Sequence, residues 1–507
     1  MAFLDNLKEE TTVGRTANGA STFTSSLNAN LDFYAQAGSM RQNKAAIKPL
    51  FAKAYDEDRE LALRNLIHLR NIRLGGLGER DAFRIAVQYL IDAKDYKAIT
   101  MIAESVGYFG RWDDLVAIMA KDTKTFDIGI EVLREQFAQD LDAMGASETV
   151  SLMAKWIPNV SVKNAERRHM AHRIAKALGY TPRDYRKVMV KLRSYIGVLE
   201  VKLAAKEYNS INFEKLPSKA LFRYRAAFNR HLEDEYQAFI KAVNSGEKQM
   251  NGKLMMPHEV IHAYREKSFD WLRGTSKLDP VLEATWKSMD DVLKDVKDNA
   301  IVVADTSGSM TSGGWGSNNT VLPWDVAQGL AIYTAERLNG AFKNNFITFS
   351  SRPQLVSLPE HGTLYDKMEE YHTHSIIDST NIEAVFDLIL DTAVKNGTPQ
   401  EDLPSKIVII SDMEFNTCAR NASLNNFDNA KRNFNAQGYE LPSVVFWNVN
   451  AHGGNMPVRF NEQGVALVSG FSTNVLSAVL GGEISSPKEM MLKVLNKPEY
   501  DFIKLGL

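Results

Sequence analysis

The spacing of apolar residues predicts a helical region over residues 31–297. Between Glu60 and Arg73, apolar residues recur at intervals of four and three, as on one face of a helix: Ala62, Leu66, Leu69 and Ile72. Similar stretches follow, separated by short Gly or Pro breaks. Many helices joined by short turns predict paired-helix stacking, as in a HEAT-like solenoid or ring. Residues 1–30 are rich in Thr, Ser, Asn and Gly and are predicted to form an extended arm.

The pattern changes near Asn299, where short apolar runs rich in β-branched residues begin. These runs are NAIVVAD, starting at Asn299, and the segments 346–350, 406–412, 443–449 and 464–470. Helical patterns lie between them. Alternating strands and helices predict a doubly wound, Rossmann-like α/β domain over residues 298–485, followed by a C-terminal tail over 486–507. The predicted fold class is therefore α plus α/β.

Composition says more about the cellular compartment of the protein than about its function. The 507 residues carry a formal net charge of −2, so the total charge indicates no partner. The single cysteine, Cys418, excludes an intrachain disulfide and is typical of a reducing compartment. The sequence contains no apolar run of the roughly 18 to 20 residues that cross a bilayer, and no signal peptide at its start. We therefore expect a cytoplasmic protein without a membrane partner.

Charge is concentrated in one block of the chain. From Lys155 to Arg230 there are 18 Lys and Arg against 5 Asp and Glu, a net +13, which leaves −15 for the rest. Such a block predicts a polyanion-binding surface, with nucleic acid as the favoured partner and no inferred DNA specificity. Five aromatic residues interleave with these cations and could stack on unpaired bases: Tyr180, Tyr185, Tyr195, Phe222 and Tyr224. The alternatives are solvated helix faces for the charges and core packing for the aromatic rings.

Five oxygen-bearing residues follow the predicted strands in metal-ligand spacing. Asp305, Ser307 and Ser309 form a D-x-S-x-S motif after the first strand, Thr380 starts a predicted helix, and Asp412 ends a later strand. In doubly wound sheets, ligands bind outside the carboxyl ends of the strands. A hard divalent cation such as Mg²⁺ takes about six oxygen ligands. We also expect Gly308 to permit the tight turn that aims both serines inward.

This motif resembles the metal-ion-dependent adhesion site of the von Willebrand A family, and the chain matches all five positions. The resemblance implies that Ser307, Ser309 and Thr380 ligate Mg²⁺, or another divalent cation such as Mn²⁺ or Ca²⁺, directly. Asp305 and Asp412 would often act through water, which leaves a position for an acidic group of a partner. The alternatives are a chance turn, and a domain whose metal is only structural or seldom bound.

Helices joined to such a domain resemble the TROVE family of Ro autoantigen ring proteins. The strings that carry the resemblance are Asn71–Arg80, Gly107–Leu115 and Met256–Glu259. Thr16–Ala20 and Ser411–Phe415 are most similar to an uncharacterised set of phage, bacterial and plant proteins of this type. The resemblance implies a HEAT-like ring that binds RNA, and hence a ribonucleoprotein scaffold.

The predicted RNA contacts come from the basic block and from a glycine-rich stretch before it. Arg73 and Arg80 flank that stretch, which resembles a phosphate-contacting loop but reads equally as an inter-helix turn. The candidates in the block are Arg167, Arg168, Arg173, Lys176, Arg183, Arg186, Lys187, Lys191 and Arg193.

One motif favours a different chemistry. His258, Glu259 and His262 match the H-E-x-x-H pattern of zinc hydrolases, but Pro257 also reads as a helix start, and no third ligand is evident. The sequence contains no G-x-S-x-G elbow and no NTPase motif, so we expect a protein that is not an enzyme. Three hypotheses remain: an RNA-binding scaffold with a Mg²⁺-dependent docking domain, a metal-dependent adhesion or assembly protein without RNA, and a zinc hydrolase.

Overall fold

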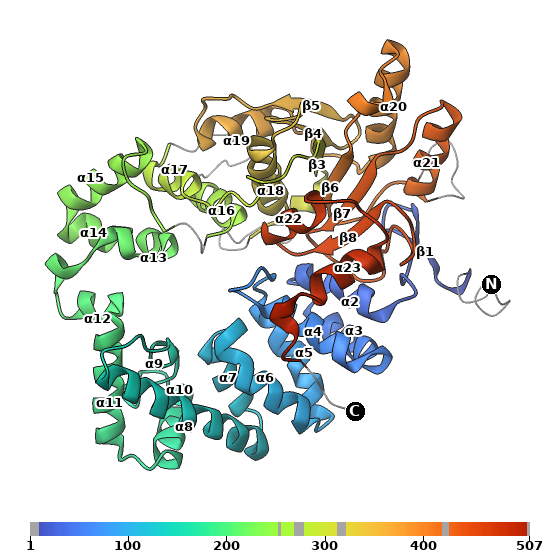
Figure 1. Cartoon of the computed structure of the whole chain (residues 1–507). Coiled ribbons are helices and arrows are strands. Elements are labelled where there is room, and N and C mark those ends of the chain that lie inside the picture. Colours follow the sequence, from blue (N-terminus) through green and yellow to red (C-terminus); the bar gives the residue numbers. More distant parts are fainter. Residues whose placement is uncertain (1–9, 252–254, 268–277, 312–320, 418–424, 504–507) are drawn as a thin grey trace. The chain divides into compact units, whose positions relative to one another are not determined.

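The computed structural model describes residues 10–251, 255–267, 278–311, 321–417 and 425–503 (Figure 1). Cys418 lies outside the described residues. The chain forms two compact units. The sheet unit comprises residues 1–65 and 213–498, and the helical unit comprises residues 66–212 and 499–507. The region predicted as one helical domain, 31–297, is thus divided between the two units.

The sheet unit contains a six-stranded sheet in the order β5-β4-β3-β6-β7-β8. Its strands are β3 (Ala300–Asp305), β4 (Asn345–Phe349), β5 (Gln354–Ser357), β6 (Lys406–Ser411), β7 (Ser443–Asn448) and β8 (Val465–Ser469). All neighbours are parallel except β4 and β5. Five strands coincide with the predicted apolar runs, because parallel strands buried on both faces are apolar throughout. The predicted α plus α/β fold class is confirmed. The antiparallel edge strand β5 was not predicted.

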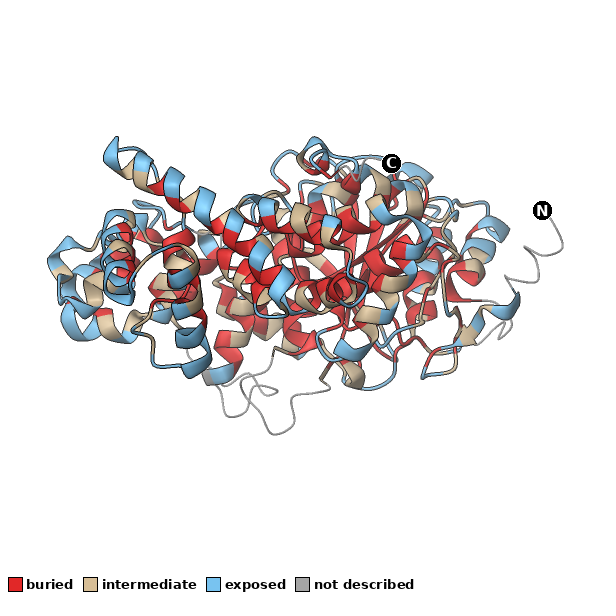
Figure 2. Cartoon of the chain, turned by 90° about the horizontal axis from the view of Figure 1, so that it is seen from below, coloured by how far each residue is buried: buried red, intermediate tan, exposed pale blue. Residues whose placement is uncertain are grey.

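In the described part of this region, six α-helices follow or separate the strands. They are α18 (Pro323–Arg337), α19 (Leu364–Thr373), α20 (Ile382–Asn396), α21 (Asn426–Ala436), α22 (Asn474–Leu480) and α23 (Pro487–Leu495). Every residue of α18 from Pro323 to Ala335 is buried, because this helix packs against β3 and β4 and also against α16 (Pro257–Lys267). Figure 2 shows the buried residues concentrated in the strands and on the inner faces of helices. The predicted C-terminal tail begins with α23, which packs against β8.

The predicted extended arm contains a β-hairpin. Strand β1 (Val13–Arg15) pairs antiparallel with β2 (Ser21–Phe23). The hairpin bridges the α/β domain at two points, Gly19 with Asn416 and Phe23 with Met456. The next helices, α2 (Ala29–Gln36) and α3 (Lys44–Glu57), also belong to the sheet unit, since α2 packs on β8.

Further α-helices among the described residues of the sheet unit lie between residue 213 and β3. They are α13 (Ser218–Arg223), α14 (Arg225–His231), α15 (Glu233–Asn244), α16 and α17 (Pro280–Lys287). Helix α4 (Arg59–Arg70) spans the boundary between the two sets of residues.

The helical unit is formed by short and medium helices that pack against their sequence neighbours. They are α5 (Arg80–Asp92), α6 (Tyr96–Phe109), α7 (Trp112–Met119), α8 (Thr123–Gly145), α9 (Met153–Trp156), α10 (Ala165–Ala177), α11 (Pro182–Ile196) and α12 (Leu199–Ala204). Among the described helices of the whole chain, none has the length and apolar character needed to cross a membrane.

Candidate functional site

The five predicted metal ligands lie where the strand order of the sheet reverses. Strand β3 lies between β4 and β6, with Ala304 paired to Thr348 on one side and Ile410 on the other. The chain runs from β3 to β4 and later returns to β6, so the carboxyl ends of β3 and β6 form the switch point. Asp305 ends β3 and Asp412 follows β6.

The first metal loop is held by the carboxylate of Asp305. Its Oδ1 accepts a hydrogen bond from the Ser307 amide at 2.8 Å, and its Oδ2 accepts one from the Ser411 hydroxyl at 2.5 Å. The hydroxyl oxygens of Ser307 and Ser309 lie 3.1 Å apart. Asp305 and Ser307 are buried, whereas Ser309 is half-buried. Two hydroxyls and one carboxylate are therefore arranged together at the end of β3.

Two more loops meet the first: the second metal loop comprises residues 378–380, and the third metal loop comprises residues 412–417. Backbone hydrogen bonds connect the first loop to the second, and the second to the third. The Gly308 amide donates to the carbonyl oxygen of Asp378 at 3.1 Å, and the Asn416 amide donates to that of Thr380 at 2.8 Å. Thr380 is buried. In the third loop, Asp412 Oδ1 accepts from the Glu414 amide at 3.2 Å. The structure thus brings all five predicted residues to one set of connected loops.

The expectation for Gly308 was wrong. Its φ is not in the left-handed region, and among the described residues an added Cβ would meet the Asp378 carbonyl oxygen alone, at 3.8 Å. The turn is held by the Asp305 side chain and by the bond from the Gly308 amide, neither of which requires a glycine.

The electrostatics of the loops favour a cation. Burial and the neighbouring Asp412 raise the pKa of Asp305, and burial raises that of Asp412. Asp412 Oδ2 is buried and has no hydrogen-bond partner among the described residues, and His452 Nε2 lies 4.0 Å from it. An unsatisfied buried carboxylate oxygen is costly unless something neutralises it. Two carboxylates and three hydroxyls are hard oxygen donors, so this set fits a cation such as Mg²⁺.

The candidate site offers hydroxyl groups as well as carboxylates. In the described parts of the chain, no three His, Cys, Asp or Glu side chains form a group that could hold a metal. A motif of acids and histidines would therefore have missed this centre.

Sequence reasoning missed the residues of the N-terminal hairpin beside the third loop. Asn18 Nδ2 donates to the Glu414 carbonyl oxygen at 2.5 Å and lies 3.4 Å from Thr380 Oγ1. The Ala17 amide donates to Glu414 Oε2 at 2.6 Å, and Thr16 Oγ1 donates to the Phe415 carbonyl oxygen at 2.6 Å. The available signal was the pair of strings Thr16–Ala20 and Ser411–Phe415, which carried the resemblance but gave no reason to place them together.

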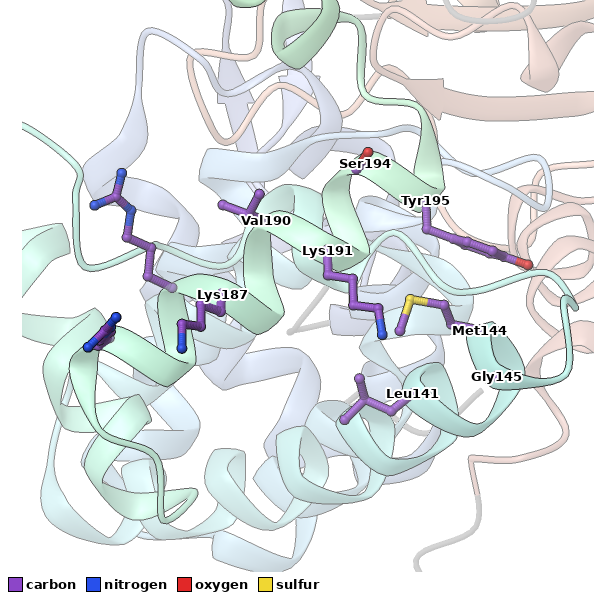
Figure 3. A pocket seen from close by; sticks show the side chains of 10 residues that line it. Leu141, Met144, Gly145, Lys187, Val190, Lys191, Ser194 and Tyr195 are labelled. Atoms are coloured by element: carbon purple, nitrogen blue, oxygen red, sulfur yellow. The ribbon is translucent and has the colours of Figure 1, made fainter.

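Several predicted RNA contacts line an open hollow in the helical unit. The hollow, with a volume of about 1070 Å³, lies between α8 and α11 and is lined by Leu141, Met144, Gly145, Arg183, Arg186, Lys187, Val190, Lys191, Ser194 and Tyr195 (Figure 3). Lys191 extends from α11 toward Met144 of α8 (Figure 3). Val190 is 51% and Tyr195 42% exposed, and the Tyr195 hydroxyl donates to the Glu148 carbonyl oxygen at 2.7 Å.

Other candidates from the basic block have structural contacts. Arg193 donates to the carbonyl oxygens of Ala154 at 2.7 Å and Ile157 at 3.0 Å, so its guanidinium holds α9 and does not face the hollow. Arg173 lies over the ring of Phe126, 4.0 Å from its centroid.

The cations of α10 and of the glycine-rich stretch remain at the surface. Arg167, Arg168 and Lys176 are exposed, although Arg168 also contacts the carbonyl oxygens of Val162 and Lys163 at 3.3 Å. Arg73 is exposed, and Arg80 pairs with Asp81 at 3.2 Å.

The aromatic candidates differ in burial, and the basic block is divided between the two units. Tyr185 is buried, and its hydroxyl donates to the Pro158 carbonyl oxygen at 3.0 Å, so this ring packs in the core. Phe222 and Tyr224 lie in the sheet unit, because the basic block crosses from one unit to the other at residue 213.

The two histidines of the H-E-x-x-H pattern lie in α16 and have other contacts. His262 Nδ1 lies 3.2 Å from Asp325 Oδ2 and 2.8 Å from Arg265 Nη2. The His258 ring is buried against Phe471, with ring centroids 5.1 Å apart, and burial lowers its pKa well below the usual value. Glu259 pairs with Lys219 and accepts from the Met256 amide at 3.2 Å, as a helix-start residue does.

Two family models match this chain, one before and one after residue 299. Residues 16–124 and 126–299 match a model described as domain of unknown function DUF2828, and residues 299–501 match domain of unknown function DUF7788. "Uncharacterized protein L728" of Acanthamoeba polyphaga mimivirus is 30% identical over 526 residues, which cover 95% of this chain and 86% of that protein. The crystal structure of Deinococcus radiodurans RO (RSR) protein is 13% identical, with a TM-score of 0.38 over 90% of this chain and 92% of that chain. The DUF2828 model matches more than half of the residues of this chain, and the chain therefore belongs to the DUF2828 family.

Proposed function

We propose that this protein is an RNA-binding scaffold whose α/β domain holds Mg²⁺ and docks an acidic group of a partner. The observation that carries the RNA part is the hollow between α8 and α11, where exposed cations border exposed apolar surface. Single-stranded nucleic acid is bound by this combination of charges for the phosphates and rings for the bases.

Helix α11 is well suited to present these charges. It starts with Pro182 after the capping Thr181 and ends at Gly197 in the left-handed conformation. Arg183, Lys187 and Lys191 recur every four residues, so they lie along one face. Their side chains are exposed, although Lys187 Nζ lies 3.5 Å from Asp184 Oδ1. Contact with phosphates would release counterions on binding. Tyr195 adds a ring whose hydroxyl is anchored, so less conformational freedom is lost on stacking.

The RNA proposal is tested with a labelled single-stranded RNA and the full chain at 50 to 200 mM salt. If about four phosphates are neutralised, the logarithm of the affinity falls with a slope of roughly −3 against the logarithm of salt concentration. A Lys187→Gln, Lys191→Gln variant should lose more affinity than the matched Lys343→Gln, Lys395→Gln variant, whose lysines are exposed in the sheet unit.

Two outcomes contradict the RNA proposal. Retention equal to that of a charge-matched control protein would favour a metal-dependent adhesion or assembly protein without RNA. An equal loss in both lysine variants would mean that the hollow has no special part in binding.

The metal part rests on Asp412 Oδ2, the buried oxygen without a hydrogen-bond partner among the described residues. In this proposal Ser307, Ser309 and Thr380 ligate the cation, and Asp305 and Asp412 hold it through their charge. When bound, the cation supplies a Lewis-acidic position for the carboxylate of a partner. The protein's own residues fix the loops, keep the carboxylates buried and leave that position open.

Magnesium-dependent thermal stability tests this part. A site that is saturated to 100 times its dissociation constant stabilises the folded state by about 2.7 kcal/mol. We expect Mg²⁺ to stabilise the wild type and Asp305→Ala to abolish the effect, whereas Asp391→Ala, an exposed residue of α20, retains it. A wild type that shows no response to Mg²⁺ or Mn²⁺ would remove the metal from the proposal.

A further inference from the structure

The turn of the N-terminal hairpin has a fixed shape. The Gly19 amide donates to the Thr16 carbonyl oxygen at 3.0 Å, and the Thr16 amide donates to that of Ala20 at 2.9 Å. The Ala20 amide also donates to Thr16 Oγ1 at 2.9 Å. Asn18 therefore projects from a closed turn and not from a free strand.

This turn fits closely on the third metal loop. It makes two polar contacts with Glu414 and Phe415, through Ala17 and Thr16, and a bridge with Asn416. Gly19 has φ +88°, and a Cβ there would lie 2.8 Å from Thr417 Oγ1. The positive φ therefore favours a glycine where the hairpin approaches this loop, whereas the exposed Thr417 side chain could rotate away from a Cβ.

Asn18 connects the second metal loop with the third. The end of its amide that faces the Glu414 carbonyl oxygen must be the NH₂ group, because a carbonyl oxygen only accepts. The same NH₂ group lies 3.4 Å from Thr380 Oγ1. A hydroxyl oxygen has two lone pairs, so one can accept from Asn18 while the other binds a cation.

We propose that Asn18 is a positioning residue of the metal centre, and that docking of the N-terminal hairpin and cation binding strengthen each other. The inference rests on the proposed metal site. Asn18 holds the Thr380 hydroxyl in register with the loop that carries Asp412, so that the ligands do not have to be ordered when the cation arrives. Outer residues that orient ligands in this way typically contribute 10- to 100-fold in metal affinity.

Mutual strengthening follows from thermodynamic linkage. If a docked hairpin raises the cation affinity by some factor, the bound cation raises the docking equilibrium by the same factor. The amides of residues 16–20 should therefore exchange more slowly when Mg²⁺ is present. Asp305→Ala should remove this effect of Mg²⁺, because that variant lacks the site.

The test uses the full chain and Mn²⁺, whose binding is followed by its electron paramagnetic resonance signal. We expect Asn18→Ala to weaken Mn²⁺ binding by at least about tenfold without lowering the melting temperature in chelator. The matched control is Thr24→Ala, whose hydroxyl bonds the Thr12 carbonyl oxygen within the hairpin region. This control should bind Mn²⁺ as the wild type does.

A second variant tests whether docking of the hairpin itself affects the Mn²⁺ affinity. Thr16→Val removes the bond to the Phe415 carbonyl oxygen and should lower both the protection of residues 16–20 and the Mn²⁺ affinity. Wild-type Mn²⁺ affinity in both Asn18→Ala and Thr16→Val would overturn the inference while leaving the metal site intact. If the wild type itself binds neither Mn²⁺ nor Mg²⁺, the proposed metal site fails, and the inference fails with it.

Discussion

Arg193 and Lys191 lie two positions apart on α11, yet their side chains have opposite tasks. Lys191 lines the hollow, whereas Arg193 holds two carbonyl oxygens at the end of α9. Burial lowers the pKa of Arg193. Its guanidinium donates hydrogen bonds to two backbone oxygens and so has a structural role. The two residues look alike in the sequence because charge alone does not say which way a helix face points.

This difference predicts opposite phenotypes at neighbouring positions. Arg193→Ala leaves two partly buried carbonyl oxygens without this donor and should lower the free energy of unfolding by about 1–3 kcal/mol, with RNA affinity retained. Lys191→Ala should leave stability within about 0.5 kcal/mol and weaken RNA binding. Urea denaturation and RNA titration of the two variants provide the comparison. Equal behaviour in both assays would contradict the assignment.

The meeting of the five residues at the strand ends was predictable from the sequence for a local reason, whereas the contacts of the hairpin residues were not. Asp305 and Asp412 end apolar strands, and the strand pattern itself places such ends at one edge of a sheet. Asn18 reaches Thr380 across most of the chain, and no periodicity records that contact. The roles of Arg193 and Tyr185 also depended on tertiary packing, which a helical pattern does not specify.

Among the elements, α16 and α18 show how a glycine can define a contact. Gly329 lies within α18, where a Cβ would be 2.9 Å from the His258 amide nitrogen and 2.9 Å from the Pro257 carbonyl carbon. Both are backbone atoms and cannot rotate away. The first turn of α16 therefore packs directly on the backbone of α18, and Asp325 fixes the same pair of helices through Arg265 at 2.8 Å.

Gly329→Ala should therefore destabilise the sheet unit, although alanine is the better helix former by about 1 kcal/mol. Overpacking against backbone typically costs about 1–3 kcal/mol, which exceeds that gain. Gly145→Ala at the end of α8 is the control, since no atom of the described residues lies within 4 Å of its added Cβ. It should be neutral or stabilising by up to about 1 kcal/mol. A urea midpoint that rises in both variants would contradict this prediction, because it would mean that α16 moves to make room for the added methyl group.

Element prediction worked where the pattern was long and continuous. Five buried strands and the principal helices between them were evident from apolar runs, whereas β5 is a four-residue edge strand with a half-exposed pattern. The hairpin β1–β2 has strands of only three residues. Such short strands are stabilised by what they dock on, which no local window contains.

At the scale of the whole molecule, the chain passes from one compact unit to the other and back. The helical unit is built from residues 66–212, and residues 499–507 return to it. Within that unit the Tyr500 hydroxyl lies 2.9 Å from His68 Nδ1, and Phe502 packs edge-on to Tyr108. Each unit contains buried apolar side chains, and we expect the two units to unfold separately.

Separate cores predict a selective effect of the metal. Mg²⁺ would bind the folded sheet unit alone, so thermal unfolding should show one transition that rises with Mg²⁺ and one that does not. Calorimetry with and without chelator measures both. Two transitions that rise together would contradict a site confined to the sheet unit.

The pairing of Gly19 with Asn416 has a consequence for synthesis on the ribosome. The ribosome makes the hairpin before the loop on which it docks, and that loop follows nearly 400 residues later. At roughly 5–20 residues per second, that delay is about 20–80 s. During this time the Thr16–Ala20 turn has no docking surface, and the second and third metal loops cannot yet be joined. The contacts between the hairpin and this loop therefore form only after both segments have been made, so a chain interrupted before residue 416 lacks them.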